Sequence, residues 1–475
     1  MTRAGGKAKA VAPALVLAAM TASLAMVFVD QTVVSVALPT IRAELGLSNA
    51  EFQWVVNAYL LAVAGLAITL GRLSDQIGHP RGMAIAIAMF AAGSLLAGAA
   101  ESPEWLIGAR LVQGAGGGML TASTISIVSD AYPKEHRGKA LGLYWGIAGL
   151  ALSLGPLLGG LITDTLGWRW IFYINPLIVL AIAPVIIRLV RAEPPRQRRG
   201  ISLDVPGSVL LAAALVALII GVQEVTVPLI AAGIVLLAVL IAVERRRANP
   251  VLELDFFRER VTVAAFLVVA LTQPVLIWGA VYFSDYLQSS LSYDPGRTGF
   301  ALLPVTVSLL IGSILGGRLT DRLGPRRPAI AGLAVVVASL AWMAVVIEED
   351  EYALLVPGFF FLGLGLQVGQ SPMATAVMNF VGDARRAVAS GMLGTCRQIG
   401  GTIGFAALSA VVIAGSSLDD GMRVALVVEA VLAGLALAAV SFLMPARAAS
   451  SSPFGGPPRS APAPADAQGP PPGRS

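Results

Sequence analysis

Long apolar segments recur along almost the whole chain, each separated from the next by a short polar or charged loop. A helix that crosses the hydrocarbon core of a membrane needs about 20 mostly apolar residues. Strands of a membrane β-barrel would alternate polar and apolar residues, which these segments do not do. We therefore predict an all-α polytopic membrane protein with fourteen transmembrane helices, at residues 12–37, 50–70, 82–100, 105–129, 138–163, 170–190, 205–223, 226–243, 262–287, 297–317, 328–347, 352–376, 387–413 and 422–444.

The composition agrees with this class. Of the 475 residues, 56% are hydrophobic and only 13% are charged, and the mean hydropathy is +0.79. A soluble chain of this length could not cover its surface with polar groups, so lipid must be its main solvent. The net charge of +5 comes from loop residues that can touch anionic headgroups, and we expect a lipid bilayer, not nucleic acid, as the partner.

Basic residues predict the orientation. With both termini in the cytoplasm, 27 of the 33 Lys and Arg residues fall in the tails and inner loops, four fall in outer loops and two lie within spans. This bias satisfies the positive-inside rule. Thirteen spans would place the basic loops of one half on the wrong face, so we reject that count. The expected location is the inner (cytoplasmic) cell membrane.

Two stretches are near copies of each other: GRLSDQIGHPR at 71–81 and GRLTDRLGPRR at 317–327. They lie 246 residues apart, and each follows the second span of a six-span unit if spans seven and eight are an insertion. Parallel repeats with a binding site between them are typical of one class of secondary transporters. The predicted organisation is a cytoplasmic tail 1–11, a six-helix bundle 12–190, a two-helix insertion 191–261, a six-helix bundle 262–444 and a disordered, Pro-rich cytoplasmic tail 445–475.

Five motifs of the first half occur in a recognisable order. They are DQTVVSVALPTI at 30–41, GRLSDQIGHPR at 71–81, RLVQGAGGGML at 110–120, GLALSLGPLLGG at 149–160 and WRWIFYINP at 168–176. Together they resemble the major facilitator superfamily, and in particular its fourteen-span drug:proton antiporter family. The resemblance covers nearly all of residues 12–444. It implies the major facilitator fold, with two pseudo-symmetric six-helix bundles in a 6+2+6 arrangement.

Two charges lie within apolar spans. A centrally placed Asp or Arg costs on the order of 2.5–3.5 kcal/mol on insertion scales, so Asp30 and Arg110 need an explanation. Both fall in the outer half of the membrane, where they can pair, and Gln113 shares a helix face with Arg110. We predict that Asp30 binds and releases the coupling proton and that Arg110 tunes the pKa of Asp30. A static ion pair is the alternative. Asp285 is a second candidate, which a position near the outer end of its span could leave merely solvated.

The duplicated loop is the expected cytoplasmic latch. Its glycines permit a tight reversal, and its Asp can pair with Arg or a helix N-terminus. The resemblance implies that this contact forms in one conformation and breaks in another, whereas an ordinary charged turn is the alternative. His79 and Pro80 stand where the family usually has basic residues, which predicts a weaker latch. The latch residues are Gly71, Arg72, Asp75, Gly78 and Arg81, with Gly317, Arg318, Asp321, Gly324 and Arg327 in the second copy.

The fifth span carries a glycine motif around a proline. Small residues let helices approach closely, and a proline can bend the helix into a pivot. Ordinary helix packing is the alternative, and the resemblance favours export, because this motif marks antiporters in the superfamily. Its residues are Gly149, Gly155, Pro156, Gly159 and Gly160.

Polar residues within the spans are candidates to line a substrate path. The alternative for each is helix packing or an interfacial anchor, and for Trp54 that alternative is favoured. They are Trp54, Asn57, Gln113, Gln273, Gln367 and Gln370. Glu429 interrupts the last span, which should be peripheral, and we expect it to snorkel or pack there. Arg397, in the thirteenth span, can mirror family features of the second half.

The energy source follows from what the sequence lacks. It has no G-x-x-x-x-G-K-[ST] phosphate loop, metal cluster or nucleophile constellation, so we expect no cofactor and no enzyme activity. The single cysteine excludes an intramolecular disulfide. We predict a monomeric proton-coupled antiporter that exports drug-like amphipathic small molecules by alternating access. The alternatives are a narrow exporter of one antibiotic or metabolite, a gradient-driven uptake carrier and a non-transporting membrane partner.

Overall fold

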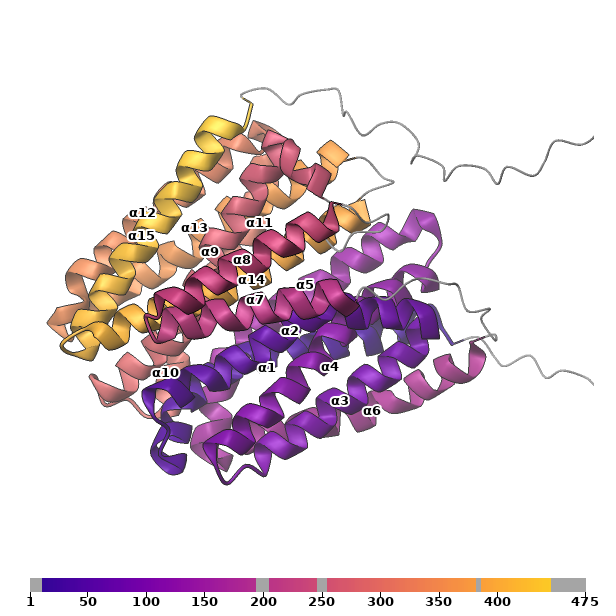
Figure 1. Cartoon of the computed structure of the whole chain (residues 1–475), viewed down its shortest axis with the longest axis horizontal. Coiled ribbons are helices and arrows are strands. Elements are labelled where there is room, and N and C mark those ends of the chain that lie inside the picture. The colour runs from indigo at the N-terminus through magenta and orange to yellow at the C-terminus, as the bar shows by residue number, and fades with distance from the viewer. Residues whose placement is uncertain (1–10, 194–204, 246–253, 382–385, 446–475) are drawn as a thin grey trace, which may run out of the picture.

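The computed structural model describes residues 11–193, 205–245, 254–381 and 386–445 (Figure 1). Within these ranges nearly every residue is helical and no strand occurs. The helices are α1 Pro13–Leu45, α2 Asn49–Ile77, α3 His79–Gly98, α4 Pro103–Ala131, α5 Lys134–Leu166, α6 Trp170–Ala192, α7 Val205–Gln223, α8 Val227–Glu244, η1 Leu254–Arg258, α9 Arg260–Ser289, α10 Pro295–Ala301, α11 Leu303–Leu323, α12 Arg326–Val346, η2 Ile347–Glu349, α13 Tyr352–Val381, α14 Arg386–Ala414 and α15 Leu418–Leu443.

Most of the expected spans appear as helices long enough to cross a membrane. Twelve described helices pass on length and apolar character, with α10 and α11 counted as one span. The α2 helix bends by 53° between Asn49–Leu66 and Thr69–Ile77 and makes a thirteenth if it is one span, while α7 supplies a shorter apolar helix, Val209–Gln223. The all-helical fold is confirmed, and its helices are compatible with fourteen spans.

The duplicated loop builds the same joint twice. Gly78 joins α2 to α3 with φ of 100°, and Gly324 joins α11 to α12 with φ of 73°. Side chains disfavour this left-handed region, so glycine permits both reversals. Both loops lie at the end of the molecule where α1 begins and α15 ends, called here the terminal end. The opposite end, which holds the α1–α2 and α3–α4 loops, is called the distal end.

The two six-helix groups repeat the same helix pairs. In the first group α4 packs against α2 and α3, α1 against α5, and α3 against α6. In the second group α13 packs against α11 and α12, α9 against α14, and α12 against α15. These are equivalent pairs if α9 to α15, with α10 and α11 counted as one helix, correspond to α1 to α6. The predicted pseudo-symmetry between two bundles is therefore present in the packing.

Glycines at equivalent positions allow the closest of these contacts. A Cβ added to Gly116 of α4 would lie 2.6 Å from the backbone nitrogen of Phe90 on α3. One added to Gly365 of α13 would lie 2.7 Å from the carbonyl oxygen of Gly332 on α12. Backbones that approach this closely gain dispersion contacts, which drive helix association where lipid removes the hydrophobic driving force.

The inserted helices α7 and α8 pair with each other, and α7 contacts both bundles, through α2 and α14. Figure 1 shows α7 lying along the boundary between them. The Gln223 Nε2 atom donates to Gln53 Oε1 of α2 at 2.6 Å. The apolar cluster at this junction contains Leu61, Ala64, Leu211, Leu215, Ile219, Leu240 and Ala406.

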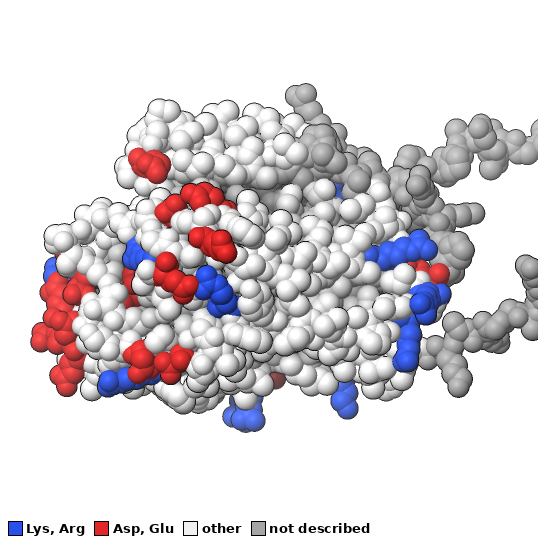
Figure 2. Space-filling view, turned by 90° about the horizontal axis from the view of Figure 1, so that it is seen from below, with Lys and Arg blue, Asp and Glu red and all other residues white. Residues whose placement is uncertain are grey.

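Charged side chains gather at the two ends of the molecule. Figure 2 shows a broad band of uncharged surface between them, with most acidic residues at the distal end, on the left. A surface of this kind suits a bilayer, in which the uncharged band contacts acyl chains and the charged ends reach headgroups and water.

Candidate functional site

A polar network lies inside the first bundle, where α1, α3, α4 and α6 meet. The Arg110 Nη1 atom donates to Asp30 Oδ2 at 2.6 Å and to Gln113 Oε1 at 2.6 Å. Gln113 Nε2 in turn donates to Asp30 Oδ1 at 2.7 Å. Exposure is 1% for Asp30, 2% for Arg110 and 0% for Gln113, so the ion pair is shielded from solvent.

Two further residues complete this network, and sequence reasoning missed both. The Asn175 Nδ2 atom of α6 donates to Asp30 Oδ1 at 3.1 Å and to Ser94 Oγ of α3 at 3.2 Å. Ser94 also accepts from Gln113 Nε2 at 2.8 Å. The available signal was weak: Asn175 is a lone amide in the apolar segment WRWIFYINP.

Arg110 has additional partners that hold its position. Its Nε atom donates to the Val55 carbonyl oxygen of α2 at 3.3 Å. Its guanidinium carbon lies 4.2 Å from the centre of the Tyr59 ring, a cation–π contact. The positive charge therefore stays compensated while Asp30 is ionised.

The two bundles meet in polar contacts at the distal end. Arg42 Nη1 of α1 lies 3.6 Å from Asp285 Oδ2 of α9, and the Arg42 guanidinium covers the Phe52 ring at 4.2 Å. Gln288 Nε2 of α9 donates to the Val36 carbonyl oxygen at 2.9 Å. Asp285 is only 5% exposed, so the alternative that it is merely solvated is wrong. These contacts join the two bundles at the distal end.

The glycine motif of α5 lies at the same boundary. Gly155 and Gly159 face α1, where an added Cβ on Gly159 would overlap the Val33 carbonyl oxygen. Gly160 faces the other bundle, where its added Cβ would overlap the Pro295 carbonyl oxygen of α10. The motif therefore lets α5 fit between the two bundles.

The other two members of that motif, Gly149 and Pro156, are placed differently from these three glycines. Gly149 has open space at the position of a Cβ. Pro156 lies inside a continuous helix, and a Cβ added to Gly299 of α10 would lie 2.8 Å from the Pro156 carbonyl oxygen. Whether Pro156 acts as a pivot stays a prediction.

At the terminal end, two contacts of the first copy of the duplicated loop lie within its own bundle. Asp75 Oδ1 lies 3.6 Å from His79 Nδ1, and Arg81 Nε lies 3.9 Å from Oε2 of Glu193, the residue that follows α6. His79 is one of the positions where the motif departs from the family pattern. Gly71 packs against Ala122 of α4. Of the residues predicted in the second copy, Gly324 is partly buried and the other four are exposed: Gly317, Arg318, Asp321 and Arg327.

The candidate substrate-lining glutamines do not share one surface. Gln113 belongs to the buried network. Gln370 Nε2 donates to Thr272 Oγ1 of α9 at 2.7 Å. Gln367 packs against α11, where a Cβ added to Gly312 would lie 3.0 Å from its Cβ, and Gln273 faces Gly401 of α14.

Two residues of α2 lie closer to the boundary between the bundles. Trp54 is half-buried against the cluster formed by α2, α7 and α14. Asn57 is completely buried one helical turn further on. Among the residues that the structure describes, neither polar atom of the Asn57 amide has a hydrogen-bond partner. Asn57 is thus the predicted lining residue with unused hydrogen-bonding capacity.

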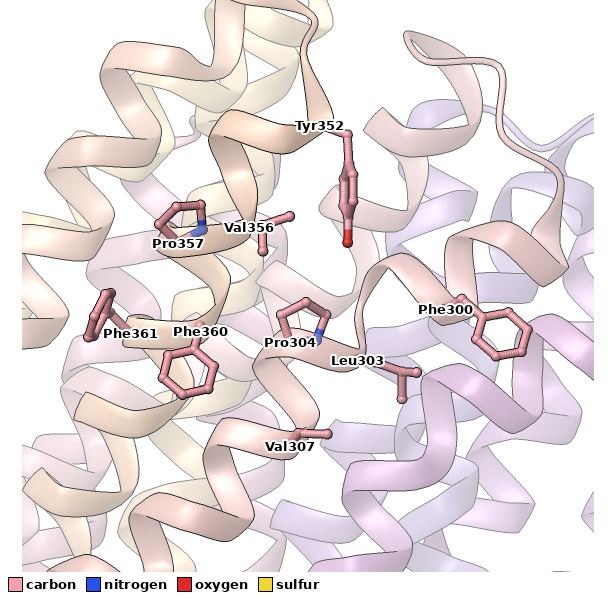
Figure 3. Close-up of a pocket in the computed structure, with 9 residues that line it drawn as sticks. All are labelled: Phe300, Leu303, Pro304, Val307, Tyr352, Val356, Pro357, Phe360 and Phe361. Carbon is pink, nitrogen blue, oxygen red and sulfur yellow. The ribbon is translucent and has the colours of Figure 1, made fainter.

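An apolar pocket of about 560 Å³ lies in the second bundle, between α10–α11 and α13 (Figure 3). Tyr352 stands at its upper edge in this view, and its hydroxyl donates to the Ala301 carbonyl oxygen at 3.0 Å. None of the six residues expected to line a substrate path lines this pocket. Its residues are Phe300, Leu303, Pro304, Val307, Tyr352, Val356, Pro357, Phe360 and Phe361.

The position of Glu429 corrects an expectation. Its side chain was expected to snorkel or pack at the periphery, but it is 0% exposed and faces the interior of the second bundle. Hydropathy shows that a charge interrupts a span and does not show which face of the helix carries it.

Two helical bundles with an apolar outer band, a buried ion pair and polar contacts across their boundary define a multi-pass membrane transporter. The sequence model of the Major Facilitator Superfamily matches residues 20–405 and 263–467. The chain belongs to this superfamily, as its motifs predicted, and it is a transporter and not an enzyme.

Sequence relatives include proteins named for drug resistance, and a solved structure shares the fold. The chain is 32% identical over 443 residues to the puromycin resistance protein pur8 of Streptomyces alboniger, covering 89% of this chain and 87% of that protein. It is 32% identical over 411 residues to the multidrug resistance protein Stp of Mycobacterium tuberculosis, covering 84% and 76%. The fold is similar to that of a D-xylose-proton symporter, with a TM-score of 0.65, 13% identity and coverage of 92% and 98%.

Proposed function

We propose that the chain is a proton-coupled antiporter that exports drug-like amphipathic compounds across the cytoplasmic membrane by alternating access. The observation that carries the proposal is the Asp30–Arg110 pair, an ionisable pair kept dry inside the first bundle. Ionisable residues inside membrane spans are expensive, and proton relays are one of the uses that retain them. The relatives named as antibiotic and multidrug resistance proteins support export as the direction.

In the proposed cycle, both termini lie in the cytoplasm. The distal contacts, including the Arg42–Asp285 pair, then lie on the outer side of the membrane, and we propose that the substrate path opens inward while they hold. Substrate binding between the bundles and proton exchange at Asp30 favour the opposite conformation, in which the distal contacts separate. Asp285 changes its partner in that step and is the second candidate for proton coupling.

A narrow exporter of one antibiotic is the second candidate function. It is favoured by relatives that are named for single compounds, among them the tetracenomycin C resistance and export protein of Streptomyces glaucescens, at 29% identity. An apolar path discriminates mainly by shape, and one methylene in such a pocket is worth only about 1–3 kcal/mol. Both candidates share the proposed coupling and differ in breadth of substrate.

The test is expression in a bacterial host that lacks its own efflux pumps. A panel of cationic dyes and antibiotics, puromycin included, is assayed for growth inhibition and for retention in energised cells. We expect lower retention of several unrelated compounds, and no such effect from Asp30→Asn at equal membrane abundance. Protection against one compound alone would favour the narrow exporter. Increased retention would show uptake and overturn the proposal.

A further inference from the structure

Glu429 lies near the middle of α15 and is completely buried. Neither of its carboxylate oxygens has a hydrogen-bond partner, and it makes no ion pair within the part of the chain that the structure describes. Its helix packs against α12 and α9, and the first of these contacts is visible in Figure 1. An ionised carboxylate in such a site is far more costly than a neutral carboxylic acid.

The position has an equivalent in the first bundle. A Gly-x-Arg triplet opens both segments, 167–175 and 421–429, and Asn175 and Glu429 each follow the triplet's Arg by six residues. Both helices pack against the first and third helices of their bundles. The same spacing is buried in each segment: Trp168 just before α6 with Ile171, Phe172 and Asn175 on it, and Met422, Ala425, Leu426 and Glu429 on α15.

The surroundings of these two equivalent positions differ. Asn175 donates to Asp30 and Ser94 in the first bundle. Gly116 of α4 and Gly365 of α13 are equivalent, and Arg110 and Gln113 precede Gly116 by six and three residues. The residues at the same distances before Gly365 are Phe359 and Leu362. Both are buried and apolar. Glu429 therefore occupies the position that Asn175 has in the first bundle. The residues at the positions of Arg110 and Gln113 cannot pair with it, because they are apolar.

None of the charged and titratable groups that the structure describes on the neighbouring helices hydrogen-bonds to Glu429. On α9, Asp285 pairs with Arg42 and the Tyr286 hydroxyl donates to the Ile347 carbonyl oxygen at 2.9 Å. Also on α9, Tyr282 stacks on Trp278. The helices α12, α14 and η2 carry four further groups. Arg326 lies at the terminal end of α12, and Glu348 of η2 pairs with Arg423. Cys396 and Arg397 lie on α14, one turn before the part of that helix that packs on α9.

We infer that Glu429 is a second proton-binding site, which holds its proton in the described conformation and releases it in the alternative one. The inference rests on the proposed function and extends it: Asp30 of the first bundle and Glu429 of the second, in place of Asp285, each bind one proton, and two protons enter for each molecule exported. A hard metal cation would need several oxygen ligands, whereas Glu429 supplies a single carboxylate.

The first test measures the proton itself. Infrared spectra of the purified full-length protein at neutral pH are compared with those of Glu429→Gln, and with Glu348→Gln as the control because Glu348 is half-exposed. We expect a carbonyl band of a protonated carboxylic acid that Glu429→Gln loses and Glu348→Gln keeps. Identical spectra for the wild type and Glu429→Gln in this region would overturn the inference.

The second test counts protons. In proteoliposomes, the membrane potential is held at zero while a range of pH gradients is imposed. The ratio of the ethidium concentrations on the two sides of the membrane is measured at equilibrium. With two protons per cycle, the logarithm of this ratio rises by two for each pH unit; Glu429→Gln should halve that slope, and Glu429→Asp should keep it. An unchanged slope in Glu429→Gln would refute the second site. A wild type that ignores the gradient would contradict the proposed function instead, and the infrared result then decides the inference alone.

Discussion

Replacing Asp30 by Asn should destabilise the protein strongly, because the change leaves a buried cation without its counter-charge. Asp30 accepts hydrogen bonds from Arg110, Gln113 and Asn175. An Asn can offer one oxygen to these donors and presents its own amide hydrogens to the rest. Arg110, 2% exposed, would lose its counter-charge and keep neutral partners such as the Gln113 oxygen, the Val55 carbonyl and the Tyr59 and Phe172 rings.

Breaking a buried ion pair from one side costs about 3–5 kcal/mol. We therefore expect Asp30→Asn to lower the free energy of unfolding by about that amount. The double variant Asp30→Asn, Arg110→Gln removes the uncompensated charge as well and should recover part of the loss. The matched control is Glu348→Gln, whose pair with Arg423 is about half-exposed and should be worth about 0–1 kcal/mol.

The assay is equilibrium unfolding in mixed detergent micelles, followed by circular dichroism and tryptophan fluorescence. The reasoning fails if Asp30→Asn is no less stable than Glu348→Gln. It also fails if the double variant is less stable than Asp30→Asn by the full cost of removing Arg110, because that result would show two independent residues instead of one coupled pair.

Two further substitutions test the boundary between the bundles. Gly159→Ala places a methyl group against the Val33 carbonyl, and it should lower the free energy of unfolding by about 1–3 kcal/mol and abolish much of the transport. The control Gly149→Ala has open space at its Cβ and should change the free energy of unfolding by less than about 0.5 kcal/mol. Equal effects of the two variants in thermal unfolding would contradict the packing assigned to the motif. Arg42→Ala removes the partner of Asp285 and should favour opening of the distal end. A cysteine at Val36, in a Cys396→Ala background, should then react several-fold faster with an impermeant maleimide added outside, and an unchanged rate would argue against this pair as part of the closed state.

The sequence was sufficient for the architecture because lipid imposes one simple condition on each span. Apolar length predicted the helices, and the duplicated loop predicted the two bundles. Asp30 and Arg110 could be paired in advance, since two opposite charges at similar depth in one bundle have few other ways to be compensated. The glycine motif likewise indicated close helix contact.

The remaining features depend on how helices are rotated and docked, which hydropathy does not encode. Arg42 and Asp285 belong to different bundles, so their contact required the relative placement of the two halves. Gln367 and Gln370 are three residues apart, yet one packs on α11 and the other bonds to α9. Glu429 was expected at the periphery and is buried, because nothing in an apolar run shows which face turns inward.

The central claim is that an intramembrane carboxyl group couples proton entry to export. The most direct measurement is ethidium uptake into inside-out membrane vesicles with an imposed pH gradient, acidic inside, for the wild type and Asp30→Asn at equal protein abundance. The account predicts uptake by the wild type that disappears when the gradient is collapsed, and no gradient-driven uptake by Asp30→Asn. Equal uptake with and without the gradient, or full gradient-driven uptake by Asp30→Asn, would contradict it.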